Sequence, residues 1–178
     1  NKISLNENHL TEKISLIEIF VKYDCVDYIK WLYKNKLILP NDLQNLGDFA
    51  FYNNSIKCAI WFDVTFKKRI DYFNVFYYSC ENNHFEIVEW LYKNRSENFN
   101  TGYRIHTMHT IAKKGYLKIL QFLYNINPER NKEYIIMSNY ALFRVAYKHG
   151  KTDILNWLLT LIDSNEISKM KLECNILI

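Results

Sequence analysis

The feature that most constrains this chain is a short pattern that recurs along its length. Apolar and polar residues alternate in the same order, with a large aromatic residue and then a leucine at the sixth and seventh positions, at 26–33, 85–92, 117–124 and 152–159. A weaker copy lies at 56–62. The aromatic residues of successive copies are 30, 29, 32 and 35 residues apart: Trp31, Trp61, Trp90, Phe122 and Trp157. Periods of this length are typical of stacked helical repeats.

Each copy has the spacing of an amphipathic helix. In 85–92 the apolar residues recur at positions i, i+1, i+3 and i+4, while the glutamates point elsewhere (Ile87, Val88, Trp90 and Leu91; Glu86 and Glu89). A periodic aromatic position suits packing between repeats better than partner binding, so we expect the tryptophans in the core. Each copy is therefore predicted to be the second, buried helix of a helical pair.

A further helix-like run and a polar turn precede each copy. The runs lie at 17–23, 49–52, 75–80, 108–113 and 142–147, and the turns contain Asp24, Asn53–Ser55, Asn82–His84, Lys114–Gly115 and His149–Gly150. Asp, Asn and Ser side chains can cap the next helix, and Gly can adopt the left-handed conformation that ends the previous one. Polar or proline-bearing loops at 35–45, 94–102 and 125–132 are expected to lead to the next pair.

The sequence predicts an all-α fold, a solenoid of about five helix–turn–helix repeats in a single domain covering 1–178. Four Gly and two Pro are too few turn formers for an all-β sandwich, and 49% apolar residues are enough for a core. The expected repeat units lie roughly at 13–45, 46–73, 74–103, 104–133 and 134–168. Atypical end units at 1–13 and 164–178 are expected to shield the ends of the stack.

This pattern resembles the ankyrin repeat over roughly residues 15–163. The shared features are a small residue, a Gly or Asn a few positions later, and then a run of branched residues, Leu and Trp or Phe. Ala112–Leu123 and Ala146–Leu159 carry them best. The Thr-Pro-Leu-His opening of typical ankyrin repeats is absent from every copy, so regular β-hairpin fingers are not expected.

The amino-acid composition of the repeats, rich in Asn, Ile, Lys and Tyr, also resembles that of the multigene-family proteins of African swine fever virus. That resemblance implies a viral host-interaction factor that affects host range or interferon and innate-immune signalling. The expected activity is non-catalytic protein–protein interaction with a host protein. A cellular scaffold of the ankyrin type is the alternative on the same fold.

No constellation of residues predicts catalysis, a metal site or a cofactor. His106 and His109 are three residues apart, but no Cys, Asp or Glu at nearby spacing completes a ligand set. Cys80 and His84 have the types of a thiolate and its base, yet they fall in a packed helix end and a polar turn. The four glycines are too far apart for a phosphate-binding loop. We therefore predict that the protein is not an enzyme.

Cysteine usage and hydropathy bear on the compartment. No C-x-x-C pair occurs among the four cysteines, and a core of this size needs no disulfides. No run of about eighteen apolar residues is present, and the first residues lack the layout of a signal peptide. We expect no membrane association and a reducing compartment, the cytoplasm, which is the host cytoplasm if the protein is viral.

The candidate binding residues lie on the first helix of each pair. In ankyrin-type stacks that helix helps to line the concave surface where partners dock. The polar and basic positions at this phase are Lys22, Tyr77, Lys113, Arg144 and Lys148. We predict a partner-binding surface formed by these five residues.

Nucleic-acid binding is the rival function. It would use Lys67–Arg69, Lys113 and Lys114, with aromatic residues of 72–78 as stacking platforms. The formal charge is only +4, from 23 basic and 19 acidic residues spread along the chain. Aromatic residues at this phase also suit the space between repeats, so the sequence favours a protein partner over nucleic acid.

Overall fold

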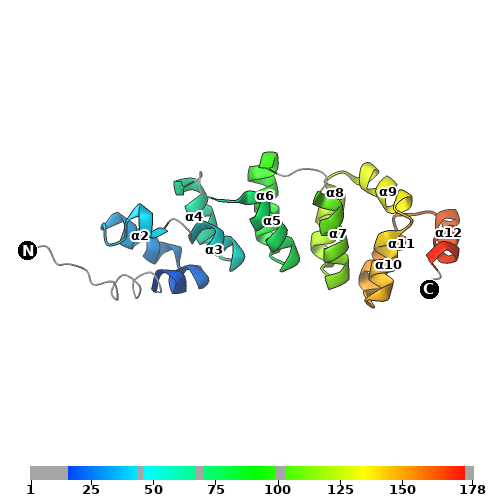
Figure 1. The fold of residues 1–178 in the computed structure, drawn as a ribbon, viewed down its shortest axis with the longest axis horizontal. Helices are drawn as coiled ribbons and strands as arrows, with labels where there is room; N and C mark the ends of the chain where they lie inside the picture. Colours follow the sequence, from blue (N-terminus) through cyan, green and yellow to red (C-terminus); the bar gives the residue numbers. More distant parts are fainter. Residues whose placement is uncertain (1–15, 44–45, 67–69, 99–102, 175–178) are drawn as a thin grey trace, which may run out of the picture. The chain divides into compact units, whose positions relative to one another are not determined.

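The computed structural model describes residues 16–43, 46–66, 70–98 and 103–174 (Figure 1). All secondary structure in these ranges is helical, which confirms the all-α class. After a first helical segment at 16–22, the elements are α2 (Val26–Lys34), η1 (Pro40–Leu43), α3 (Leu46–Tyr52), α4 (Ile56–Phe66), α5 (Tyr72–Glu81), α6 (Phe85–Arg95), η3 (Ser96–Asn98), α7 (Tyr103–Lys114), α8 (Leu117–Asn125), α9 (Pro128–Met137), α10 (Ala141–Lys148), α11 (Thr152–Leu159) and α12 (Ser164–Cys174).

The chain divides into two compact units, Asn1–Ser79 and Cys80–Ile178. In the first unit α3 packs on α4, and α2 packs on α4. The second unit repeats this arrangement: α7 packs on α8 and α10 on α11, while α7 also contacts α10 and α6 contacts α8. First helices thus pack on first helices, and second helices on second helices. The stacking of both units into one solenoid stays a prediction.

One turn recurs at each of the five predicted junctions. It contains a residue with positive φ, seven residues before the aromatic residue of the repeat: Asp24 (54°), Asn54 (59°), Asn83 (62°), Gly115 (88°) and Gly150 (63°). At the last turn the amide of Gly150 donates to the carbonyl of Tyr147 at 3.0 Å, and that of Lys151 donates to Ala146 at 2.9 Å. This pair of bonds is the Schellman motif.

The same two bonds recur around Asp24, Asn54 and Gly115. Because Gly and Asn tolerate the left-handed conformation best, the residues at the turns explain why each first helix ends there. We therefore use the positive-φ residue as the reference point of each repeat.

The predicted side-chain caps are wrong for most of these turns. The N-cap residues Cys25, His84, Tyr116 and Lys151 make no side-chain cap bond. Instead, the Asp24 carboxylate accepts from the amides of Lys57 at 3.2 Å and Cys58 at 2.9 Å, in the first turn of α4. These amides have no partner within their own helix. Asp24 therefore caps the second helix of the following repeat.

The loops that connect the pairs are more helical than predicted. Within the expected loop 125–132, α9 begins at Pro128, the favoured first position of a helix, and the Asn127 side chain accepts from the Arg130 amide at 3.2 Å. Asn131 is buried, and its amide group donates to the carbonyls of Leu123 at 3.2 Å and Tyr124 at 2.9 Å. Short 3-10 helices also occur in the other two connections.

The aromatic residues at the repeat position are not all buried. Trp61, Trp90 and Trp157 are half-buried, but Trp31 is 58% exposed, so the core prediction is wrong for it. Three of the later positions receive a tyrosine ring edge-on, with the tyrosine two residues after the preceding aromatic position. The ring pairs are Tyr33–Trp61 (5.7 Å), Tyr92–Phe122 (5.7 Å) and Tyr124–Trp157 (5.4 Å).

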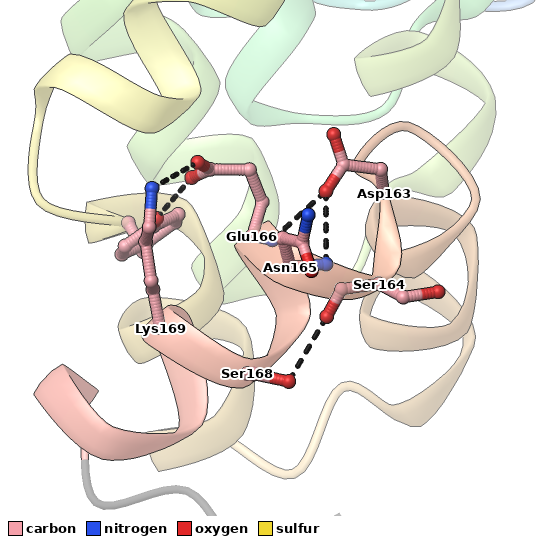
Figure 2. Close-up of polar contacts among 7 residues, drawn as sticks. Asp163, Ser164, Asn165, Glu166, Ser168 and Lys169 are labelled. Carbon is pink, nitrogen blue, oxygen red and sulfur yellow. Dashed lines mark hydrogen bonds and ion pairs between the residues drawn. The ribbon is translucent and has the colours of Figure 1, made fainter.

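The last repeat is followed by α12 (Figure 2). The Asp163 carboxylate accepts from the amides of Asn165 and Glu166, both at 2.9 Å, and so caps this helix. The hydroxyl of Tyr140 donates to the Glu166 carboxylate, which also pairs with Lys169 at 2.8 Å. Met170 on α12 is fully buried. The predicted end unit 1–13 lies outside the described residues, as does 175–178.

Candidate partner-binding surface

The five predicted binding residues occupy two positions relative to the positive-φ residue. Lys22, Lys113 and Lys148 each lie two residues before it, and Tyr77 and Arg144 each lie six residues before it. Both positions are on the polar side of the first helix. The three lysines are exposed, while Tyr77 and Arg144 are half-buried.

The structure brings three of the five residues onto a pair of adjacent helices. Lys113 is on α7, and Arg144 and Lys148 are on α10, which packs against α7. Lys22 and Tyr77 belong to the first unit, on the segment 16–22 and on α5. A single surface that includes all five residues stays a prediction.

Both α7 and α10 lack acidic residues. Their polar positions carry Lys, Arg, His and Thr, whereas first helices of the first unit have Glu18 in 16–22 and Asp48 in α3. Glu18 and Asp48 occupy the same position relative to the turn as Arg144. We define the α7/α10 surface as the outward-facing side chains His106, His109, Lys113, Arg144, Tyr147 and Lys148.

Sequence reasoning about binding missed His109. It lies six residues before Gly115, the position that Arg144 occupies in the next repeat, and this register would have identified it. Burial lowers the pKa of His109, and the nearby His106 and Arg144 lower it further. Its Nε2 lies 3.4 Å from the hydroxyl of Tyr134 on α9. His109 is therefore neutral at pH 7 and offers hydrogen bonding rather than charge.

The guanidinium of Arg144 contacts other residues of the second unit. It donates to the carbonyl of Asn139 and lies 4.0 Å from the sulfur of Cys174 on α12. Lys114, next to Lys113, donates its ammonium to the carbonyl of Glu81 at the end of α5, at 2.7 Å. Lys113 and Lys148 are consequently the exposed charges of the α7/α10 surface, flanked by Tyr147, which is 42% exposed.

The side chains considered for catalysis lie in unsuitable surroundings. Cys80 is fully buried, and burial raises the pKa of its thiol well above the ordinary value, so a reactive thiolate is disfavoured. His106 and His109 lie one turn apart on α7. Among the described residues, no three His, Cys, Asp or Glu side chains come close enough together to hold a metal ion. The non-enzymatic function stays a prediction.

The aromatic residues at 72–78 are largely used inside the first unit. Phe76 is buried, and the hydroxyl of Tyr72 donates to the buried carboxylate of Asp63 at 2.5 Å. The ring of Tyr78 lies 4.5 Å from that of Tyr52. These contacts favour the packing interpretation over a stacking platform for bases. Lys67–Arg69, the basic part of that prediction, lies outside the described residues.

Comparison of the chain with protein-family models, curated proteins and solved structures finds no match. The resemblance to ankyrin repeats therefore stays a prediction. In the described ranges, no helix has the length and apolar character needed to cross a membrane. Over the described residues the fold is all-helical and built from helix–turn–helix units.

Proposed function

We propose that this chain is a non-catalytic module for protein–protein interaction, a degenerate ankyrin-like solenoid that binds an acidic protein segment on the α7/α10 surface. The observation that carries the proposal is the charge of two adjacent first helices. They present Lys113 and Lys148 and contain no carboxylate. Because α7 and α10 contain no Asp or Glu, no carboxylate of these helices would repel the partner's acidic groups or pair with the two lysines in their place.

The chemistry of the surface suits a protein partner. The two lysines attract an acidic partner over a long range and so accelerate association. Because both lysines are exposed, this attraction weakens strongly as the salt concentration rises. Tyr147, next to Lys148 on α10, adds an exposed aromatic ring with a hydroxyl group, a residue type that is enriched in protein interfaces. Neutral His109 can donate or accept one hydrogen bond.

The partner class follows from the resemblance to the viral multigene-family proteins. A host protein of interferon or innate-immune signalling, met in the host cytoplasm, is the first class to test. A cellular scaffold would use the same surface with a cellular partner.

The test is capture of partners from nuclease-treated host-cell extract, followed by mass spectrometry. The test variant is Lys113→Glu/Lys148→Glu, and the matched control is Lys93→Glu/Lys132→Glu, on α6 and α9, which changes net charge equally. All four lysines are exposed, and the ion pair between Lys93 and Glu89 (3.0 Å) that the control loses lies on the surface and contributes little, so circular dichroism should show unchanged helicity for both. Arg144 is left intact because of its contacts with Asn139 and Cys174.

A protein retained by the native chain and the control, and lost by the test variant, would support the proposal and identify the partner. Equal retention by all three chains would refute the α7/α10 surface. If binding is seen only without nuclease treatment, and if it falls steeply with salt in a direct oligonucleotide assay, nucleic-acid binding replaces the proposed function.

A further inference from the structure

The outward side of α2 exposes two large aromatic side chains, Tyr28 and Trp31. Trp31 is 58% exposed and Tyr28 is 63% exposed, and with Asp27 they line a hollow of about 390 Å³. The ring of Tyr28 is kept in place by stacking on Phe20, with centroids 5.4 Å apart. Trp31 lies about 160° around the helix from Ile29, which is fully buried.

Later repeats show what normally covers this position. Trp61 and Trp157 occupy the position of Trp31, and each receives a tyrosine ring edge-on from the second helix of the repeat before it. Tyr33, which covers Trp61, lies on α2, and α2 packs directly on α4; Tyr124, which covers Trp157, lies on α8. Within this chain, the partner that fits such a surface is therefore a second helix of the same motif with aromatic side chains.

We propose that the outward side of α2 is an interface between two copies of this chain, related by a two-fold axis near Trp31, with the two α2 helices antiparallel. Each copy supplies an aromatic second helix of this motif, with Tyr28 and Trp31 as the covering rings because Tyr33 already packs on Trp61. An isologous pair is also the commonest form of assembly among soluble homo-oligomers. Trp31 and Tyr28 of one copy pack against the same two residues of the other.

The charges on α2 are complementary in this arrangement. Asp27 lies one turn before Trp31 and Lys34 lies nearly one turn after it, on the same side of the helix. About a two-fold axis at Trp31, Asp27 of each copy faces Lys34 of its partner. A parallel pair would place Asp27 against Asp27 and Lys34 against Lys34, which would be repulsive.

The first measurement is the association state of the full chain, by sedimentation equilibrium over a range of concentrations. A reversible dimer is expected, with tryptophan emission shifting to shorter wavelength as Trp31 is covered. Trp31→Glu should raise the dissociation constant at least about tenfold, since tryptophans at the centre of an interface carry much of its affinity. Leu172→Glu is the matched control: the residue is apolar and 85% exposed on α12, and the dissociation constant should not change.

The second measurement tests the antiparallel geometry. Asp27→Lys alone and Lys34→Asp alone should each weaken self-association, because both ends of the pair then bring like charges together. An equimolar mixture of the two variants should restore a dimer that contains one chain of each, since every opposing pair is again of opposite sign.

Three results would overturn the proposal. One is a monomer at all concentrations in which Trp31 remains accessible to a quencher. Another is a monomer with Trp31 shielded at all concentrations, which would assign the surface to an occupant from the same chain. The last is a dimer that Trp31→Glu leaves intact or that the mixed variants do not restore.

Discussion

Trp31 and Trp157 occupy the same position of the same sequence motif, yet their surroundings differ. Trp157 is half-buried, with the ring of Tyr124 edge-on at 5.4 Å, and α12 follows its repeat. Trp31 is 58% exposed, and no described helix precedes the pair to which it belongs. The difference shows that the aromatic residue contributes to the core only when another helix lies beside it, because one helical pair cannot bury its own apolar surface.

The largest expected effect is on stability at these two positions. Trp157→Ala should lower the free energy of unfolding by about 3 kcal/mol, because it removes a ring packed between repeats. Trp31→Ala should cost less than about 0.5 kcal/mol, as for an exposed residue, under conditions where the proposed dimer is dissociated. Urea titrations followed by circular dichroism measure both values. Equal costs would contradict the comparison.

The turns of the first and last repeats should differ by a smaller amount. Gly150→Ala introduces only the strain of a left-handed alanine, about 1 kcal/mol, since the added methyl group meets no neighbour within 4 Å. Asp24→Ala adds the loss of the two hydrogen bonds that the Asp24 carboxylate accepts from amides of α4. It should lower the free energy of unfolding by about 2 kcal/mol.

Asp24→Gly separates the two contributions at the first turn. It removes the carboxylate but keeps the backbone conformation accessible, so its cost in urea titrations should fall between that of Asp24→Ala and zero. A cost for Asp24→Gly equal to that of Asp24→Ala would assign the whole effect to the cap.

The contacts of α12 at the end of the last repeat predict a pH dependence of the stability. The bonds with Lys169 and Tyr140 lower the pKa of Glu166 below 4.5, so its contribution is present above pH 4.5 and lost as pH falls through the folded value. The hydrogen bond to Glu166, with burial, raises the pKa of Tyr140 from 10.0 to about 12, so that contribution is present below pH 10 and lost between pH 10 and 12.

Two variants check this pH dependence. Tyr140→Phe should remove one phenolate, the one that titrates at about pH 12, from the titration followed by ultraviolet absorbance. Glu166→Gln should reduce the loss of stability in acid. If the phenolate that disappears in Tyr140→Phe titrates at the ordinary tyrosine pKa, the Tyr140–Glu166 bond does not persist in solution.

The smallest effect concerns thiol reactivity and leaves stability unchanged. Cys25, in the first turn, and Cys174, on α12, are half-exposed and should react first with a maleimide. Cys58 and Cys80 are buried, and burial raises the pKa of Cys58 to about 12, so both should react only on unfolding. Peptide mass spectrometry at short times gives the order, and early labelling of Cys80 would reopen the question of a catalytic thiol.

Much of the local structure could be predicted from sequence. Asp, Asn and Gly at the junctions indicated the five turns, since few other residues adopt positive φ at low cost, and helical periodicity indicated the pairs. The helix at Pro128–Met137 was missed because proline and asparagine were interpreted as loop signals, although the same residues also start helices. Three of the five predicted binding residues could be related to one surface. His109 was missed because it is a histidine and the search followed basic residues such as Arg144, although both lie six residues before the turn glycine.

The sequence by itself determined the helical class, the positions of the turns and the basic character of α7 and α10, because these depend on local backbone preference and residue type. Only the tertiary structure decided that Asp24 caps α4, that Tyr124 covers Trp157 and that Trp31 is exposed. The physical reason is that burial and hydrogen bonding between repeats depend on residues about 33 positions away, and a repeated pattern cannot report which of its copies has a neighbour.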